Sequence, residues 1–228
     1  MFWTRTGSVL KHLRFTRSQL AGYLSGCLAF SCGAYLFIHS HLGVDPLDVL
    51  ALGVLRHLPL TVGICQAAVA AICILIWAAW YRRRPVLSPF FTFFFCGSLI
   101  DLLRWSRVAE IVALDRYVSL LSGVILCAYG SSLIIMSGIG IRAMDLVAIG
   151  MVDKWRWPFW AAKGSLEGVL LLTGYLLGGP VGVGTLCFLA FVDTLIQPMM
   201  WLNSRMLRLP NLGIPQLSRL PVPHEGQA

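Results

Sequence analysis

Four carboxylates and one amine lie within or beside long apolar segments of this chain, where ionised groups are rare. They are Asp48, Asp145, Glu167, Asp193 and Lys163. A charge near the centre of a bilayer costs roughly 2.5–3.5 kcal/mol on insertion scales, and such groups mark functional sites by default. The chemistry available to them is the binding of a proton, a cation or a polar solute inside a membrane. We predict that these five residues line a substrate or ion pathway.

Three of these residues also have a purely structural interpretation. Lys163 and Glu167 are four residues apart, on one helical face, so they can pair near a membrane surface while the lysine extends toward water. Asp193 either is unpaired, and then protonated or facing a cavity, or pairs with an arginine such as Arg142. The sequence leaves both alternatives open.

Other kinds of site find no support in the residues. The seven cysteines lie in apolar segments without a CxxC pair, and His39, His41 and His57 have no metal-binding spacing to carboxylates. The stretch 178–184 is rich in glycine but lacks the Gly-Lys-Ser/Thr ending of a phosphate loop. We therefore expect no cofactor, no metal and no enzymatic activity.

The composition decides the class of protein that must position these groups. Hydrophobic residues make up 57% of the 228 residues and charged residues only 12%, about half the charge of a typical soluble domain. The formal net charge is +8, but the cations stand at the ends of apolar stretches and form no basic stripe with exposed aromatics, so nucleic acid is not expected as a partner. The composition predicts an integral membrane protein.

Six apolar segments are long enough to span a bilayer. A basic N-terminal tail, 1–18, precedes them, and a Pro-rich C-terminal tail, 203–228, follows. With six spans, thirteen Lys and Arg residues of the tails and connections lie on the side that carries both tails, and four lie on the other side. Because Lys and Arg are enriched on the cytoplasmic side, this predicts that both termini are cytoplasmic. The predicted spans are 19–38, 62–81, 86–103, 117–139, 158–178 and 183–202.

An internal repeat divides the body into a first half, 19–105, and a second half, 106–202. At an offset of 97 residues, Asp48 matches Asp145, and glycine and alanine positions around them match as well. Each aspartate lies in a segment too short and too charged to span, so we expect two short helices at membrane depth or at the interface. The alternative to a pathway role for the two aspartates is that they only cap or flank these helices. Two halves of three spans each must insert with opposite orientation, a plan found in secondary transporters. A duplication kept for structure alone is the alternative.

The repeat also relates residues outside the short helices. Asp193 has Asp101 as its counterpart, close to the end of a span, and there we expect a surface pair with Arg104. Gln66 occupies the position equivalent to Lys163. The charged pair Lys163–Glu167 therefore belongs to one half only.

Two motifs together resemble the YczE/YitT-type bacterial membrane proteins. They are Leu-Gly-Val-Asp-Pro-Leu-Asp-Val-Leu at 42–50 and Gly-Gly-Pro-Val-Gly-Val-Gly-Thr at 178–185. The resemblance runs from about residue 20 to 202 and implies a polytopic protein of the bacterial inner membrane, described as a transporter or regulatory protein without a settled activity. The second half departs from the first motif, because Arg142 stands where the first half has Asp45.

The sequence thus predicts an all-α integral membrane protein with about six transmembrane helices in two inverted repeats. The function we expect is that of a secondary-transporter-like permease for a small solute, with carboxylates coupling alternating access to a proton or cation. A non-transporting membrane scaffold that regulates a partner is the alternative. The expected partners are the lipid bilayer and a small solute or coupling ion, and a homo-oligomer is left open.

Overall fold

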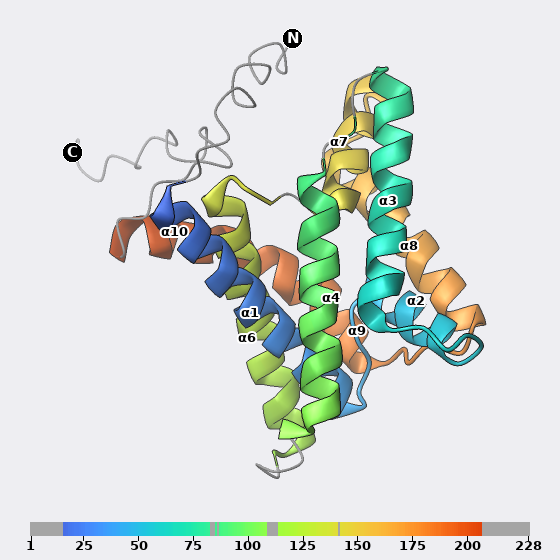
Figure 1. Ribbon diagram of the computed structural model, residues 1–228, viewed down its shortest axis with the longest axis vertical. Helices are drawn as coiled ribbons and strands as arrows, with labels where there is room; N and C mark the ends of the chain where they lie inside the picture. The colour runs from blue at the N-terminus through green and yellow to red at the C-terminus, as the bar shows by residue number, and fades with distance from the viewer. Residues whose placement is uncertain (1–15, 83–84, 86, 109–113, 141, 207–228) are drawn as a thin grey trace, which may run out of the picture.

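The computed structural model describes residues 16–82, 85, 87–108, 114–140 and 142–206, and it is all-helical over these residues (Figure 1). The predicted tails lie outside the described residues except for 16–18 and 203–206. The helices are α1 (Arg17–Ser40), α2 (Pro46–Leu55), α3 (Val62–Tyr81), α4 (Ser88–Ser106), α6 (Arg116–Ser137), α7 (Ala143–Trp155), α8 (Phe159–Leu176), α9 (Val183–Cys187), the π-helix η2 (Phe188–Val192) and α10 (Asp193–Met206).

Each of the six predicted spans coincides with a helix or with the continuous run α9–η2–α10. Among the described residues, four helical segments are long and apolar enough to cross a membrane: α1, α3, α6 and the run Val183–Arg205. The other two, α4 and α8, carry two charged residues each and fall outside this set. The chain is thus a membrane protein by the length and apolarity of its helices, and crossings by α4 and α8 stay a prediction.

Both predicted short helices are present and begin where their sequence signals place them. Pro46 takes the first position of α2, where a missing N–H costs nothing, and the Asp45 side chain caps the helix by accepting from the Asp48 N–H at 2.6 Å. Arg142 occupies the equivalent cap position of α7 but makes no side-chain cap bond. The two short helices lie near opposite ends of α3, with α7 at the top of the view and α2 lower down (Figure 1).

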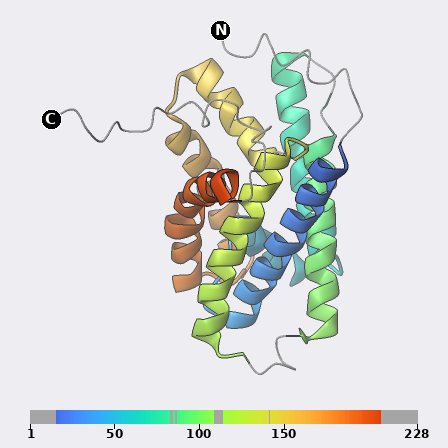
Figure 2. The ribbon, with the colours of Figure 1, turned by 90° about the vertical axis from the view of Figure 1, so that its left-hand side faces the viewer.

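The long helices α1 and α6 lie side by side and form the central crossing of the fold (Figure 2). Small residues bring their backbones together. A methyl group added to Gly33 on α1 would lie 2.7 Å from the Cys127 backbone nitrogen, and one added to Gly26 would lie 2.9 Å from the Gly130 carbonyl oxygen. Neither glycine can therefore be enlarged without moving the opposite helix.

The turns that end α1 and α6 have the same hydrogen bonds. The Ser40 hydroxyl donates to the Phe37 carbonyl at 2.7 Å and accepts from the Leu42 N–H at 3.2 Å. The Ser137 hydroxyl does the same with Ile134 at 2.6 Å and Ile139 at 3.2 Å. All three residues of the second turn follow those of the first by 97 positions, the offset found in the sequence.

Contacts between helices also repeat when the two halves are exchanged. Helix α2 packs on α8, and α7, the equivalent of α2, packs on α3, the equivalent of α8. Likewise α1 packs on α4, and α6 packs on α10. The close pairing of α3 with α4 is not matched to the same extent between α8 and α10, so the two halves differ where the charged residues of the second half are found.

Candidate functional site: a buried charged network

Four charged side chains of the second half meet inside the protein, and we call them the buried charged network: Arg142, Lys163, Glu167 and Asp193. The Lys163 amine donates to Asp193 Oδ1 at 2.6 Å, and Arg142 Nη2 lies 3.5 Å from the same oxygen. Lys163 Nζ is also 3.6 Å from Glu167 Oε1. The four side chains are between 8% and 25% exposed, so their charges are largely removed from solvent.

Three helices supply these residues. Arg142 immediately precedes α7, and Lys163 and Glu167 lie one turn apart on α8. Asp193 is the first residue of α10, directly after the π-helix η2. Insertion of such a wide turn changes the direction of the residues that follow it, and π-helical turns are frequent at functional sites. Here the wide turn precedes the carboxylate that both cations contact.

Arg142 is held at the centre by neutral partners as well as by Asp193. Its Nη2 donates to the Ser131 hydroxyl at 3.4 Å, and its guanidinium carbon lies 6.0 Å from the centroid of the Phe30 ring. Burial by itself lowers the pKa of Arg142, but the surrounding carboxylates, Asp145 first among them, more than offset this and raise it above its ordinary value. The residue is therefore a permanent cation.

A second polar group belongs to the first half. The Gln66 side-chain amide on α3 donates to Asp48 Oδ1 at 2.7 Å, and Asp48 is only 1% exposed. Asp45, in the loop before α2, lies beside it, and burial raises the pKa of Asp45 although the Asp48 N–H and the Arg142 charge act in the opposite direction. Asp45 therefore connects the two polar groups electrostatically.

Carboxylates outnumber cations in this region. The buried cations here are Arg142 and Lys163, and the carboxylates that interact with them or with one another are Asp45, Asp48, Asp145, Glu167 and Asp193. Arg104 and Asp101 also act on Asp48, but they form a pair of their own and balance each other. Asp145 Oδ1 and Glu167 Oε1 are buried and accept no hydrogen bond from the described part of the chain. If all five carboxylates were ionised, three negative charges would have no cation to balance them, a costly arrangement in a low dielectric. The site can therefore take up protons or a cation.

The structure places four of the five predicted pathway residues in these two groups, leaves Asp145 with only an electrostatic interaction with Arg142, and decides some of the alternatives. Lys163 and Glu167 are in contact, as their spacing predicts. Of the two alternatives for Asp193, the structure has the paired one, with Arg142 as expected and with Lys163 in addition. Asp48 does not cap α2, because its own N–H is capped by Asp45. Their role in a pathway stays a prediction.

The expected surface pair of Asp101 with Arg104 is present, but Asp101 has two closer partners. Its two carboxylate oxygens accept from the Val62 and Gly63 N–H groups at the start of α3, at 3.0 and 2.8 Å, while Arg104 Nη1 lies farther away at 3.9 Å. The main role of Asp101 is thus to cap a neighbouring helix, where a negative charge is favoured. A contact between segments distant in sequence cannot be found from local spacing.

Sequence reasoning did not select Asp45 or Ser131 as site residues. The repeat offers a signal for the first, because the 97-residue offset aligns Asp45 with Arg142, so that equivalent positions carry opposite charges. For Ser131 no signal exists in the sequence. Within the described ranges no group of three His, Cys, Asp or Glu could hold a metal ion.

The comparisons with known proteins define the family. A family of unknown function (DUF6198) matches residues 17–200. The chain belongs to this family. The match covers both halves of the membrane body, the two short helices and all four residues of the buried charged network.

Three proteins of two bacteria are similar to this chain over most of their length. The uncharacterised membrane protein YczE of Bacillus subtilis is 24% identical over 165 residues, which cover 72% of this chain and 77% of that protein. The uncharacterised protein YyaS of the same organism is 26% identical over 183 residues, 78% of this chain and 90% of that protein. An uncharacterised protein of Haemophilus influenzae is 22% identical over 178 residues, 78% and 81% of the two chains. No solved structure matches the chain. The resemblance to YczE-like proteins is confirmed, and none of these names assigns an activity.

Proposed function

We propose that this protein is a secondary-transporter-like permease for a small solute, in which carboxylates bind the coupling proton or cation. The observation that carries the proposal is the excess of buried carboxylates over cations, with two buried oxygens, on Asp145 and Glu167, that accept no hydrogen bond within the described residues. Charged groups inside a membrane domain are expensive and mark ion or substrate pathways. A purely structural network would be expected to balance its charges.

The arrangement of the halves supports an inverted repeat. The two serine turns, the exchange of helix contacts and the positions of α2 and α7 near opposite ends of α3 all agree with two related halves of opposite orientation. Transporters built in this way place their sites where discontinuous helices meet, near the middle of the membrane. Here the breaks between α1 and α2 and between α6 and α7 provide Asp45 and Arg142.

The mechanism we infer is alternating access. One half rocks against the other about the α1–α6 crossing, and the buried charged network opens to one side of the membrane at a time. Glu167 and Asp145 take up the coupling ion, while Arg142 and Lys163 hold Asp193 in place. The positive-inside pattern of the sequence orients this cycle with both termini in the cytoplasm of a bacterial cell.

The experiment is a solute screen with purified full-length protein at two pH values, measured by thermal unfolding in detergent and followed by uptake into proteoliposomes. A ligand present at a hundred times its dissociation constant raises the free energy of unfolding by about 2.7 kcal/mol. We expect a stabilising solute whose effect and uptake are lost in Glu167→Gln. The matched control is Asp101→Asn, which alters a carboxylate outside the network.

Two results would count against a transporter. One is a solute hit and uptake that persist unchanged in both Glu167→Gln and Asp145→Asn while these variants remain folded. The other is that no solute of a broad panel stabilises the protein or is taken up, while in cells only variants of exposed residues such as Arg82 lose function. That second result would favour a scaffold that acts on a partner.

A further inference from the structure

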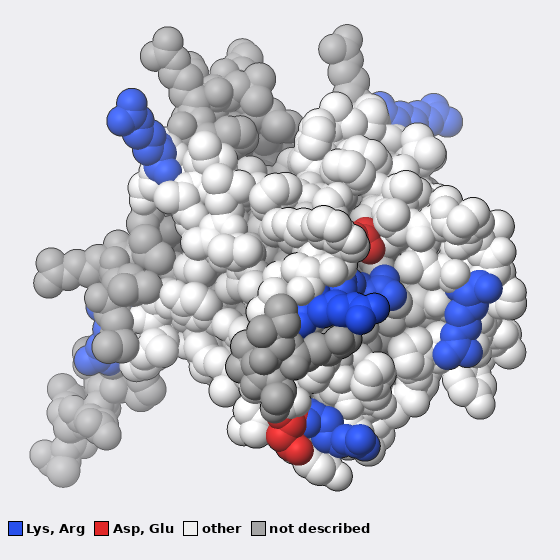
Figure 3. All heavy atoms as spheres, turned by 60° about the horizontal axis from the view of Figure 1, so that its bottom comes forward, with Lys and Arg blue, Asp and Glu red and all other residues white. Residues whose placement is uncertain are grey.

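A second polar site lies at the opposite end of the molecule from the described start of α1. It is a pocket of about 350 Å³ between the end of α1, the loop that follows, α2, the end of α4 and the α8–α9 connection. This volume is within the range of small-molecule sites. The face that carries the end of α4 is mostly uncharged, with basic side chains in a few places (Figure 3).

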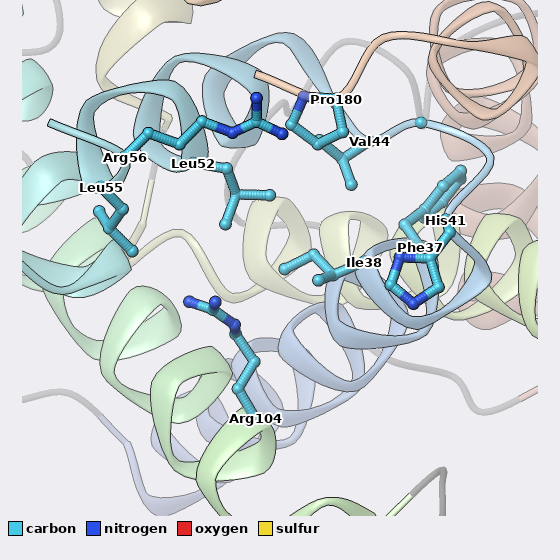
Figure 4. Close-up of a pocket in the computed structure, with 10 residues that line it drawn as sticks. Phe37, Ile38, His41, Val44, Leu52, Leu55, Arg56, Arg104 and Pro180 are labelled. Atoms are coloured by element: carbon cyan, nitrogen blue, oxygen red, sulfur yellow. The ribbon is translucent and has the colours of Figure 1, made fainter. Parts of the chain in front are cut away.

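Two arginines provide the charge of this pocket. Arg104 points into it from the end of α4, and Arg56 extends along its other side toward Pro180 (Figure 4). Arg56 forms no ion pair within the described residues. Arg104 has Asp101 at 3.9 Å, but both oxygens of that carboxylate already accept backbone N–H groups. The pocket therefore has two guanidinium groups, which are suited to carboxylate and phosphate oxygens.

The remaining walls are mainly apolar. Phe37, Ile38 and Leu52 lie between and beside the two arginines (Figure 4). A pocket with apolar walls and a few charged groups selects a ligand that has both an apolar body and a charged head. Inorganic phosphate alone would leave the apolar walls in contact with water.

One wall is fixed by a close backbone contact. Gly43, with φ at +114°, lies against the start of α9, and the Gly184 N–H donates to the Leu42 carbonyl at 2.7 Å. A side chain on Gly43 would lie 2.7 Å from the Gly182 nitrogen. Because this hydrogen bond and the close packing hold the loop against α9, this side of the pocket is formed before any ligand binds. A preformed wall lowers the entropic cost of binding.

From these features we propose that the pocket binds a small organic anion, with its carboxylate or phosphate head between Arg56 and Arg104 and its apolar body against Phe37 and Leu52. Binding at this site requires no movement of the two halves, so it stands independently of the proposed transport. If transport takes place, the pocket is where an anionic solute would first be held at this face.

The test is direct binding to the full-length protein in nanodiscs of phosphatidylcholine, measured by calorimetry with hexanoate and hexyl phosphate. Hexylamine and acetate are the comparison ligands. We expect both hexyl anions to bind, acetate to bind more weakly and hexylamine not to bind. Arg56→Gln and Arg104→Gln should each weaken the affinity roughly tenfold, the usual effect of losing a hydrogen bond to a charged group. Arg116→Gln, at the start of α6 outside the pocket, is the matched control.

The same probe distinguishes a free anion from a lipid headgroup. If phosphatidylglycerol in the nanodisc competes with hexyl phosphate in the wild type but not in the double arginine variant, the pocket is confirmed and its occupant is lipid. If it does not compete, the occupant is a free anion. Unchanged affinity in the double variant, equal binding of hexylamine, or no binding at about 10 mM, well above a millimolar dissociation constant, would overturn the proposal.

Discussion

The ion pair between Lys163 and Asp193 offers the sharpest test of the network's energetics. At 2.6 Å, with the two side chains 13% and 25% exposed, each group depends on the other for the balance of its charge. Removing one partner of a buried pair leaves a charge uncompensated, at a cost of 3–5 kcal/mol for full burial. Because both side chains retain some contact with solvent, we expect about 2–4 kcal/mol for Lys163→Met and for Asp193→Asn.

A double-mutant cycle isolates the pair from other effects. The Lys163→Met/Asp193→Asn variant should cost less than the sum of the single variants, with a coupling energy of about 1–3 kcal/mol. The assay is equilibrium unfolding in mixed micelles with increasing SDS, and Lys154→Met, at an exposed position of α7, is the control. Additive single effects, with a coupling energy under about 0.5 kcal/mol, would refute the claim that these side chains form a buried network.

Three further predictions test the scaffold that carries the network. Gly33→Ala should destabilise the protein by about 1–3 kcal/mol in the same unfolding assay, because the added methyl group meets the α6 backbone. The control Gly22→Ala, whose methyl group meets nothing within 4 Å, should be neutral or stabilising. Equal effects of the two substitutions would contradict the close α1–α6 crossing. Asp101→Ala should cost about 1–2 kcal/mol through loss of the α3 cap, and Asp101→Asn, which keeps an acceptor oxygen, should cost less. Alkaline phosphatase fused after Leu58 should be active in a bacterial host and inactive when fused after Arg156, and the reverse pattern would reject the proposed orientation.

Much of the helical layout could be predicted from the sequence because it depends on local properties. The apolar runs, the basic residues at their ends and the Asp-Pro start of α2 give the positions of the helices to within a few residues. The 97-residue offset also predicted which positions would be equivalent, and the two serine turns have matching hydrogen bonds at that offset.

The partners of the charged groups could not be predicted in the same way. Asp193 and its partner Lys163 are 30 residues apart in the sequence, and Asp101 and its partner Gly63 are 38 residues apart. Both contacts therefore depend on how the helices pack. The π-helix before Asp193 also has no clear sign in the sequence Phe-Leu-Ala-Phe-Val. A helical period fixes which residues share a face but not which helix that face meets.

The most direct test of alternating access is the reactivity of a cysteine at the network. Ser131 lies beside Arg142 and is only 3% exposed, so a static protein would protect a cysteine there from both sides. We propose Ser131→Cys in a background without the seven native cysteines, labelled with a membrane-impermeant maleimide in right-side-out and in inverted vesicles. The account predicts labelling from both sides, at rates that change in opposite directions when Glu167→Gln is added. Labelling from one side only, or from neither, would contradict it.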